Sequence, residues 1–419
     1  MSEWRKVKFL DVYKIQGGSQ PPKKDFVYEP KDGFIRLLQI RDFGDKPLPT
    51  YVPITNKLKI CSEDDVLIGR YGGQGKILTG MAGAYNVAIA KVIIPKCVSS
   101  RFTYHLLKSD VFYNFITSIE RSTIDGFNKD DLSKLIIKIP PTIEEQQQIV
   151  ERLEVRLEKL NNARTKLDKI PLVLKCFRQS VLASACSGKL TGIWREGKGL
   201  LEWEDTELHN FCSYIVDCPH STPKWTECGK LCVRTTNFKP NFLDLSIQQY
   251  VSEETFNNRI SRLKPMPNDI LYSREGGILG IACIIPENVE LCLGQRMMLM
   301  RTSKSNNPKF LMYILNSPII TSIVREKTGG SASPHLNVGE IKKFVIPHPP
   351  IMEQEEIVRR VDKLFSIADC IEERYKIAKN SIKQKKLYML KLFVASCNLF
   401  HKAYPILSGE LYGYIIGCY

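Results

Sequence analysis

Two long stretches of the chain repeat apolar residues at alternating steps of three and four positions, which places them along one side of a helix. The first stretch contains Pro171, where we expect the helix to kink or restart, because proline lacks a backbone N–H and clashes with the preceding turn. Seams of this length predict two long coiled-coil helices. The predicted seam residues are Ile149, Leu153, Leu160 and Leu167 in the first stretch and Ile357, Val361, Leu364, Ile371 and Ile382 in the second.

The simplest way to bury both seams is to pack them against each other. The two helices would then form an antiparallel pair, a rod roughly 50 to 60 Å long. Such a rod would hold the flanking regions at a fixed distance. The alternative is two unrelated amphipathic helices, each covering its own globular region.

The remaining parts of the chain, residues 1–140 and 203–347, have a different pattern. They are rich in glycine, proline and aromatic residues and contain short β-branched runs bounded by turn formers. Each region also contains a stretch with helical spacing, near residues 100–120 and 308–327. The sequence therefore predicts two α+β globular regions.

The chain also repeats itself at long range. The segment from Asp65 to Gly73 returns as the segment from Asp269 to Gly277, with the aspartate and the arginine both recurring 204 positions later. A Pro-Pro pair followed by acidic residues, glutamine and isoleucine precedes both helical stretches. This period indicates two copies of a whole module related by pseudo-two-fold symmetry. The predicted divisions are 1–140, a first globular region; 141–190, a central helical spacer; 191–202, a linker; 203–347, a second globular region; 348–395, a distal helical spacer; and 396–419, a tail.

Composition narrows the class of protein. The 419 residues are 43% hydrophobic and 25% charged, without an apolar run approaching the roughly 20 residues of a membrane span or the apolar core of a signal peptide, so we expect a cytoplasmic protein. The 13 cysteines are scattered, and we expect reduced thiols. The cluster Cys212, Cys218, His220, Cys228 and Cys232 lacks paired C-x-x-C spacing, so no metal site is predicted.

The formal charge of +15 favours a polyanionic partner, with nucleic acid as the leading candidate. Solvated helix faces are the alternative source of this charge. Motifs for catalysis or nucleotide binding are lacking. The glycine-rich run from Gly69 to Ile77 is one residue too long for a phosphate loop, and Ile77 stands where Ser or Thr would hold magnesium.

The globular regions carry polar and basic residues at equivalent loop positions, and the two sets differ. Arginine reads guanine, asparagine and glutamine read adenine, and Ser, Thr and Lys contact phosphates or bases. Two globular regions with the same fold and different loop side chains suit the recognition of two different short sequences. Arg70 and Arg274, which recur in both regions, could equally form core ion pairs. The DNA-binding candidates are Ser19, Gln20, Lys23, Lys24, Arg36, Gln39, Arg41, Arg70, Lys76, His220, Ser221, Thr222, Lys224, Arg234, Thr235, Thr236, Asn237, Arg274, Gln295 and Arg296.

These features together give a family resemblance that covers nearly the whole chain. The chain resembles the DNA specificity subunit of type I restriction-modification enzymes. The residues that carry the resemblance are the turns at Asp65 and Asp269, the Asn128-x-x-Asp131 and Asn337-x-x-Glu340 steps, the Ile-Pro-Pro-type entries into the helices, and the segment from Ala185 to Thr191.

The resemblance implies a noncatalytic subunit in which two target recognition domains alternate with two helical spacers. Each domain would read one half of a bipartite asymmetric site in double-stranded DNA, and the helices would set the spacing and dock two modification subunits. S-adenosylmethionine would be bound by those subunits, and ATP and magnesium by further restriction subunits. This chain would bind no cofactor, contact no membrane, and act in a bacterial or archaeal cytoplasm.

The C-terminal tail departs from the family pattern, because Ser408-Gly409-Glu410-Leu411 resembles the ending of the central spacer but falls about ten residues late. A rival interpretation is a two-domain coiled-coil scaffold that binds protein partners without DNA sequence specificity.

Overall fold

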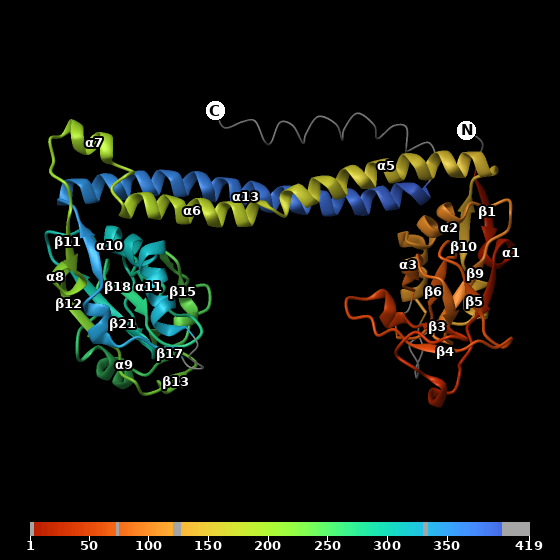
Figure 1. Cartoon of the computed structure of the whole chain (residues 1–419), viewed down its shortest axis with the longest axis horizontal. Helices are drawn as coiled ribbons and strands as arrows, with labels where there is room; N and C mark the ends of the chain where they lie inside the picture. Colours follow the sequence, from red (N-terminus) through yellow and green to blue (C-terminus); the bar gives the residue numbers. More distant parts are fainter. Residues whose placement is uncertain (1–3, 73–74, 120–126, 330–333, 396–419) are drawn as a thin grey trace. The chain divides into compact units, whose positions relative to one another are not determined.

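The computed structural model describes residues 4–72, 75–119, 127–329 and 334–395. The chain divides into two compact units: unit 1 consists of Met1–Asp168 and Arg374–Tyr419, and unit 2 of Lys169–Glu373. Each unit combines one α/β region with parts of both predicted helical stretches (Figure 1). The predicted tail, residues 396–419, lies outside the described residues.

Unit 1 contains two four-stranded sheets and a two-stranded ribbon. The first sheet has the antiparallel order β2(Lys14–Gly17), β9(Ile89–Ile93), β6(Leu67–Gly69), β7(Ile77–Leu78). The second has the order β4(Tyr51–Pro53), β3(Phe34–Leu38), β8(Gly83–Tyr85), β5(Ile60–Cys61), with β3 and β8 parallel. The ribbon pairs β1(Arg5–Lys8) with β10(Ile136–Ile139).

The helices of unit 1 cover the first sheet and join it to the helical spacers. They are α1(Phe9–Val12), α2(Ser100–Leu107), α3(Asp110–Thr117), α4(Lys129–Leu132) and α5(Ile143–Leu167), with the short 3-10 helices η1(Lys23–Asp25) and η2(Ile40–Phe43). Ser99 caps α2, because its side chain accepts a hydrogen bond from the backbone N–H of Phe102. Thr142 caps α5 in the same way, with Glu144 and Glu145 in the first turn, where the helix dipole favours negative charge.

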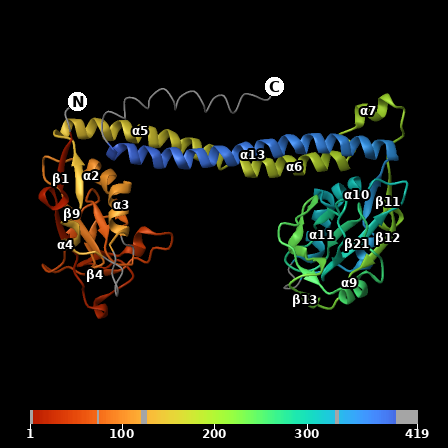
Figure 2. The same ribbon diagram turned by 180° about the vertical axis from the view of Figure 1, so that it is seen from behind.

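One helix, α13(Ile351–Ala395), supplies residues to both units. In unit 1, its residues Ile382, Met389 and Phe393 are buried in the same core cluster as Ile149, Leu153 and Leu160 of α5. Lys379 forms an ion pair with Asp168 at the end of α5. Further along α13, the ring of Phe393 packs on Phe102 of α2, and the cap of α2 is hydrogen-bonded to Gln146 near the start of α5, so α5 and α13 run antiparallel. Figures 1 and 2 show them side by side over α2 in both views.

The first sheet of unit 2 repeats the strand order of the first sheet of unit 1, whereas the second sheets differ in one edge strand. The first sheet of unit 2 has the antiparallel order β12(Cys212–Asp217), β21(Met297–Thr302), β18(Ile270–Ser273), β19(Ala282–Ile284). The second has the order β13(Trp225–Thr226), β17(Tyr250–Val251), β14(Lys230–Val233), β20(Cys292–Leu293), with β14 and β20 parallel. Two ribbons complete it: β11(Glu204–Glu207) with β22(Val345–His348), and β15(Phe238–Lys239) with β16(Phe242–Leu243).

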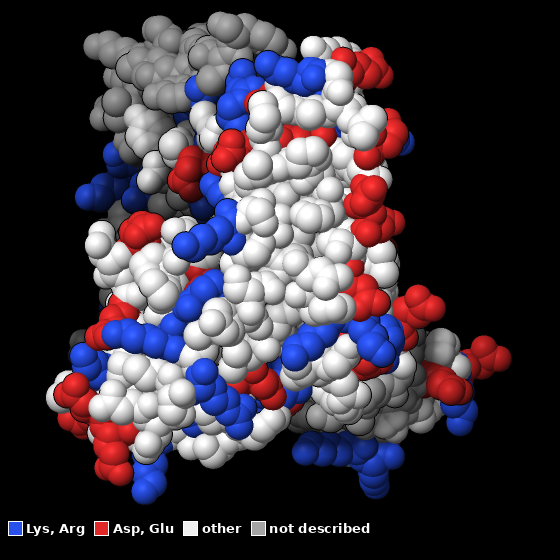
Figure 3. All heavy atoms as spheres, turned by 90° about the vertical axis from the view of Figure 1, so that its left-hand side faces the viewer, with Lys and Arg blue, Asp and Glu red and all other residues white. Residues whose placement is uncertain are grey.

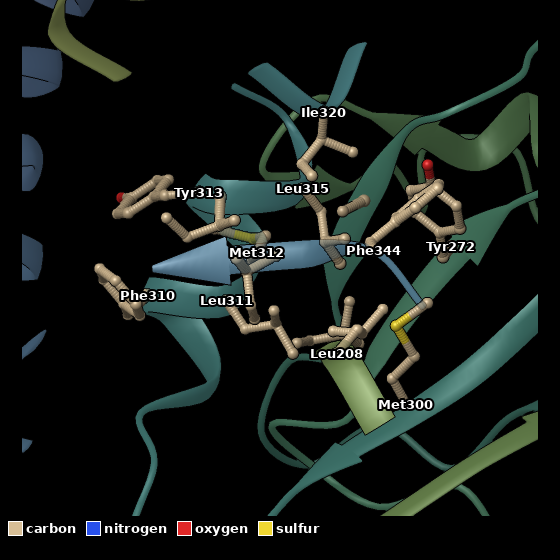
Figure 4. Close-up of a cluster of buried hydrophobic side chains, with 14 of the residues drawn as sticks. Leu208, Tyr272, Met300, Phe310, Leu311, Met312, Tyr313, Leu315, Ile320 and Phe344 are labelled. Atoms are coloured by element: carbon tan, nitrogen blue, oxygen red, sulfur yellow. The ribbon is translucent and has the colours of Figure 1, made fainter. Parts of the chain in front are cut away.

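The core of unit 2 lies between its first sheet and the spacer helices. Figure 4 shows side chains of α10(Pro308–Leu315) gathered with Leu208, Tyr272 and Met300. Val181 and Leu182 of α6 and Ile357 and Val361 of α13 belong to the same buried cluster. The helices of this unit are α6(Ile170–Cys186), α7(Gly192–Gly197), α8(Leu208–Phe211), α9(Glu253–Ile260), α10(Pro308–Leu315), α11(Pro318–Thr328) and α12(Val338–Lys342), with η3(Thr235–Asn237).

In unit 2 the helices α6 and α13 also run antiparallel. Arg178 of α6 binds Asp369 and Glu372 of α13 at 2.6 and 2.9 Å, whereas the carbonyl of Leu190, further along the chain, accepts a hydrogen bond from Arg360. The first predicted helical stretch therefore forms two helices, α5 and α6, with Pro171 in the first turn of α6, where its missing N–H costs nothing.

Two details of the helical regions were not expected. The predicted linker 191–202 contains helix α7. Ile371, a predicted seam residue, is 42% exposed, whereas Ile357, Val361 and Ile382 are at most 5% exposed. An undistorted helix turns about 20° per heptad away from a 3.5-residue repeat, so a residue two heptads beyond Ile357 need not face the same partner. Leu167 and Leu364 are partly buried against their core clusters.

Candidate nucleic-acid interface

In unit 2, three segments meet at one edge of the first sheet. β12 ends at Asp217 and β18 ends at Ser273, and both run antiparallel to β21, which begins at Met297. The loops that follow β12 and β18 and the loop that precedes β21 must therefore lie together. We call residues 217–224, 274–280 and 294–296 the unit 2 corner.

Arg274 lies at the centre of this corner and is 5% exposed. Its Nε and Nη2 donate to both carboxylate oxygens of Asp217 at 2.8 and 2.9 Å, and its Nη1 lies 2.5 Å from Oε1 of Glu275. Nε2 of His220 lies 3.0 Å from Oδ2 of Asp217. A bidentate arginine–carboxylate pair fixes the mutual orientation of both groups. Asp217 and Glu275, which motif analysis did not select, therefore organise this corner.

The loop from His220 to Thr222 is held by donors from neighbouring segments. Nε2 of Gln295 donates to the carbonyl of His220 at 2.6 Å and to Oγ1 of Thr222 at 3.0 Å. Arg259 of α9, which is 7% exposed and was also not predicted, donates to the carbonyl of Ser221. Gln295 thus uses its amide within the fold, whereas the side chains of His220, Ser221 and Thr222 are on exposed residues.

A second group of predicted residues surrounds η3. Arg234 is exposed, and its guanidinium lies 5.8 Å from the ring centroid of Trp225 and donates to Oε1 of Gln249 at 3.1 Å. Asn237 is a cap instead, because its Oδ1 accepts from the backbone N–H of Arg234 and its Nδ2 donates to two carbonyls. Of the other predicted residues, Lys224 and Thr236 are exposed and Thr235 is half-buried.

Unit 1 has an equivalent corner, formed where β2 and β6 end and β9 begins. The backbone defines the correspondence. The N–H of Arg70 donates to the carbonyl of Ala88 at 2.7 Å, as the N–H of Arg274 donates to that of Arg296 at 3.0 Å. In the first sheet of unit 1, Gly17 is the last residue of β2 and pairs with Ala90. Asp217 takes the same place in unit 2, as the last residue of β12, and pairs with Met298. The unit 1 corner therefore has glycine and alanine where unit 2 has aspartate and arginine.

The environment of Arg70 differs from that of Arg274. Arg70 is half-buried, its Nε donates to the carbonyl of Phe127 at 3.5 Å, and its Nη2 donates to the hydroxyl of Tyr71 at 3.2 Å. Its guanidinium also lies 5.1 Å from the ring centroid of Tyr71. The recurring arginine is thus an ion-pair partner in unit 2 and contacts uncharged groups in the described part of unit 1.

Several predicted residues of unit 1 face the fold around η2. Asp42, 2% exposed, accepts from the backbone N–H of Gln39 at 2.7 Å and lies 3.6 Å from the guanidinium of Arg36. The side chains of Gln39 and Arg41 both donate to Oγ1 of Thr50, at 3.3 and 3.1 Å. These contacts stabilise the short helix and leave Arg36 and Gln39 half-buried.

The remaining predicted residues of unit 1 lie on loops. Oγ of Ser19 accepts a hydrogen bond from the backbone N–H of Lys59 at 3.2 Å, and Nζ of Lys76 donates to the carbonyl of Phe43 at 3.1 Å. Gln20, Lys23 and Lys24 are exposed.

Ion pairs within the sheets neutralise part of the basic charge. Lys91 lies 2.5 Å from Asp65, and Arg301 binds both carboxylate oxygens of Asp269 at 2.8 and 2.7 Å. Burial alone would raise the pKa of Asp65, but the hydrogen bonds and charge of Lys91 and the hydrogen bonds from Ser62 hold it below its usual value. The two recurring aspartates therefore stabilise the sheets.

The basic residues do not cover every face of the molecule. Figure 3 shows the side of unit 2 on which β11 and β12 lie in Figure 1, where an uncharged middle is bordered by intermingled basic and acidic groups. A surface that contacts phosphates needs an excess of positive charge. This face therefore does not have the charge distribution of a phosphate-binding surface.

The cysteines near residue 220 are separated in the fold. Burial raises the pKa of Cys218 and raises that of Cys212 to about 12, which disfavours the thiolate that binds metals. Across residues 4–72, 75–119, 127–329 and 334–395, no three His, Cys, Asp or Glu side chains are grouped as metal ligands. Within the same ranges no helix is both long and apolar enough to cross a membrane.

The two α/β units share the strand order of their first sheets, and the corners of these sheets carry different side chains. A family model for the type I restriction modification DNA specificity domain matches residues 1–172 and 202–380. The chain belongs to this family. Its members serve as DNA specificity subunits, a noncatalytic role, and catalysis in type I systems resides in other subunits.

Curated relatives agree with this family assignment. The specificity subunit of the type I restriction enzyme EcoKI from Escherichia coli strain K12 is 27% identical over 375 residues, covering 82% of this chain and 78% of the relative. The specificity subunit of MjaVIII from Methanocaldococcus jannaschii is 24% identical over 401 residues, covering 91% of each.

Solved structures show the same fold. A chain from a study of complex assembly and conformational transition of the type I R-M system superposes with a TM-score of 0.69, at 16% identity and with coverage of 95% of this chain and 99% of that one. The HsdS subunit from Thermoanaerobacter tengcongensis gives a TM-score of 0.59, at 17% identity and with coverage of 94% and 97%.

Proposed function

We propose that each α/β region reads one half of a bipartite, asymmetric site in duplex DNA. The observation that carries this proposal is the pair of matching corners with different side chains: Gly17, Arg70 and Ala88 in unit 1 correspond to Asp217, Arg274 and Arg296 in unit 2. The two corners have the same backbone arrangement but carry different side-chain donors. This suits the reading of two different base sequences, because base edges present different donor and acceptor patterns in the major groove.

The spacer helices are proposed to form one antiparallel coiled coil that relates the two regions by a pseudo-two-fold axis and sets the spacing of the half-sites. The antiparallel pairing of α5 and of α6 with different parts of α13 supports this proposal. The same helices are proposed to dock two modification subunits. Large apolar side chains on the spacers are available for such contacts: Leu172 is 67% exposed, Val173 62% and Ile377 60%.

The domain limits follow the sequence divisions, with target recognition domains at 1–140 and 203–347 and spacers at 141–190 and 348–395. The two matched segments of the family model are compatible with them. S-adenosylmethionine is proposed to bind the modification subunits, and ATP and magnesium the restriction subunits. Cellular duplex DNA as the substrate implies action in the cytoplasm.

The proposal is tested by expressing the full chain with the modification subunits of its host and mapping modified adenines across the genome. The expected motif has two short specified sequences separated by unspecified base pairs. Replacing residues 1–140 with the corresponding region of another specificity subunit should change one half only. A change in both halves would exclude independent reading by the two regions.

DNA footprinting of the same complex separates this function from the protein-binding scaffold. Two protected patches with unread base pairs between them are expected. Protection without sequence preference, or affinity that does not fall steeply with salt, would favour the scaffold, because phosphate contacts release counterions and make DNA binding salt-dependent.

A further inference from the structure

We propose that the two regions read guanine with different arginines of the same corner, Arg70 in unit 1 and Arg296 in unit 2, and that Arg274 is a positioning residue. This inference rests on the proposed function and assigns base-reading side chains to it. It starts from the backbone correspondence of the corners, in which Arg70 matches Arg274 and Ala88 matches Arg296.

In unit 2 the recurring arginine is not available to DNA. Arg274 is 5% exposed, binds Asp217 through two hydrogen bonds and contacts Glu275. Its Nη1, which contacts Glu275, also donates to the carbonyl of Leu336 at 3.4 Å. A guanidinium has five N–H donors in a fixed fork, and these contacts occupy both of its edges. Arg274 therefore joins the loops of the corner instead of reaching a base.

In unit 1 the place of Asp217 is taken by Gly17. A Cβ atom added at Gly17 would lie 3.3 Å from Nη1 of Arg70, so the glycine leaves this side of the guanidinium uncovered. Arg70 donates to the carbonyl of Phe127 and the hydroxyl of Tyr71, and within the described residues no carboxylate forms an ion pair with it. Among the described residues, the contacts of Arg70 therefore neutralise none of its positive charge and use only part of its donor fork.

Unit 2 has a second arginine at this corner, Arg296, which is exposed between the half-buried Gln295 and the buried Met297. Its φ is +67°, a conformation that suits glycine and tolerates asparagine. Of the four non-glycine residues with positive φ in the described ranges, Arg296 is the one that is not asparagine. The backbone alone would favour glycine here, so the presence of arginine points to a role for its side chain.

The side chain of Arg296 lies across the glycine turn at Gly276. A Cβ added at Gly276 would lie 3.3 Å from Nη1 and 3.5 Å from Cδ of Arg296, so the glycine turn gives the side chain room to lie across it. Within the described part of the chain no carboxylate forms an ion pair with Arg296. As far as the structure describes the chain, each corner therefore presents a guanidinium without a carboxylate ion pair, but from a different backbone position.

Among the bases, guanine is the best match for a guanidinium that has no carboxylate partner. Its two parallel N–H donors fit the O6 and N7 acceptors that guanine presents in the major groove, and the pattern is bidentate. Lysine keeps the charge but cannot form the same planar fork. Arg296→Lys and Arg70→Lys therefore separate base reading from general attraction to phosphate.

The experiment uses the complex of the full chain with its modification subunits and a library of random-sequence duplex DNA, from which bound duplexes are selected and sequenced. We expect Arg296→Lys to reduce the preference for one guanine in one half-site by about 5- to 150-fold and to leave the other half-site unchanged. Arg70→Lys should do the same in the opposite half-site. Affinity for random DNA should stay roughly constant, because the charge is kept.

Lys304→Ala controls for general attraction to phosphate, since this exposed lysine follows the far end of β21 from Arg296 and its loss removes one positive charge. It should leave both half-sites unchanged. An unaltered motif in Arg296→Lys, with a clear bipartite motif in the wild type, would overturn the assignment of Arg296 while leaving the proposed function intact. Absence of any bipartite motif in the wild type would overturn the proposed function itself.

Discussion

Arg195 donates a hydrogen bond from Nε to Oε1 of Glu353 at 3.0 Å, although 158 residues separate them in the chain. Thr191 and Trp203 also donate to this carboxylate, at 2.6 and 2.8 Å, and Glu353 is fully buried. The contact ties α7 and the start of the second α/β region to the first turn of α13. It fixes the junction at which the chain leaves the central spacer.

Glu353→Gln is expected to destabilise unit 2 by about 3 to 5 kcal/mol, because it leaves Arg195 charged and buried without its main partner. Urea unfolding followed by tryptophan fluorescence is a direct measurement, since Trp203 contacts the site. Glu372→Gln is the matched control: this glutamate also pairs with an arginine, but its side chain is 41% exposed, so a loss of about 1 kcal/mol or less is expected. Equal losses would contradict a structural role for Glu353.

The helices were predictable because their signals are local. Alternating steps of three and four depend only on neighbouring turns, and Pro171 marks the start of α6 within the same window. The buried carboxylate was not predictable in this way. Glu353 looks like an ordinary acidic residue of a helix start, and its donors Thr191, Arg195 and Trp203 come from distant parts of the chain.

The corners illustrate the same limit. The recurrence of arginine at positions 70 and 274 is visible in the sequence, but its partner is set by which residue ends the neighbouring strand. That residue is Gly17 in one unit and Asp217 in the other. Positive φ at Arg296 also has no sequence signal, because arginine rarely adopts it. Candidate residues could thus be selected by type and loop position, but not divided into those that hold the loops and those that face solvent.

Ile371 and Ile382 both fit the heptad pattern, but they differ in how far they are buried. Ile382 is 5% exposed in the core of unit 1, so Ile382→Ala should cost about 2 to 5 kcal/mol through lost apolar burial and a residual cavity. Ile371 is 42% exposed, and Ile371→Ala should cost less than about 1 kcal/mol. Chemical denaturation of the two variants measures both values. A larger loss at Ile371 would place it in a buried seam.

The ion pair between Asp65 and Lys91 predicts a pH dependence for unit 1. Because folding lowers the pKa of Asp65, its stabilising contribution is complete above the pKa of the unfolded chain, about 3.9, and is lost as pH falls through the lower folded value. The free energy of unfolding should therefore differ between wild type and Asp65→Asn more at about pH 6 than at about pH 3. Asp32→Asn, at an exposed position, controls for the loss of one negative charge. A difference that stays constant over this range would show that Asp65 does not titrate with folding.

Lys23 and Lys24, exposed on η1 in a loop that follows β2, are expected to contact phosphates and not bases. Each phosphate contact contributes about 0.9 to the slope of log affinity against log salt, so the double alanine variant should flatten this slope by about 1.8. It should weaken binding equally for cognate and random duplexes, because phosphates carry no direct sequence information. Titrations at several salt concentrations measure both effects.

The matched control is the double variant Lys159→Ala and Lys166→Ala, which removes the same charge from exposed positions of α5 and should leave the slope unchanged. A loss of discrimination between cognate and random DNA in the η1 variant would instead make these lysines base-reading residues.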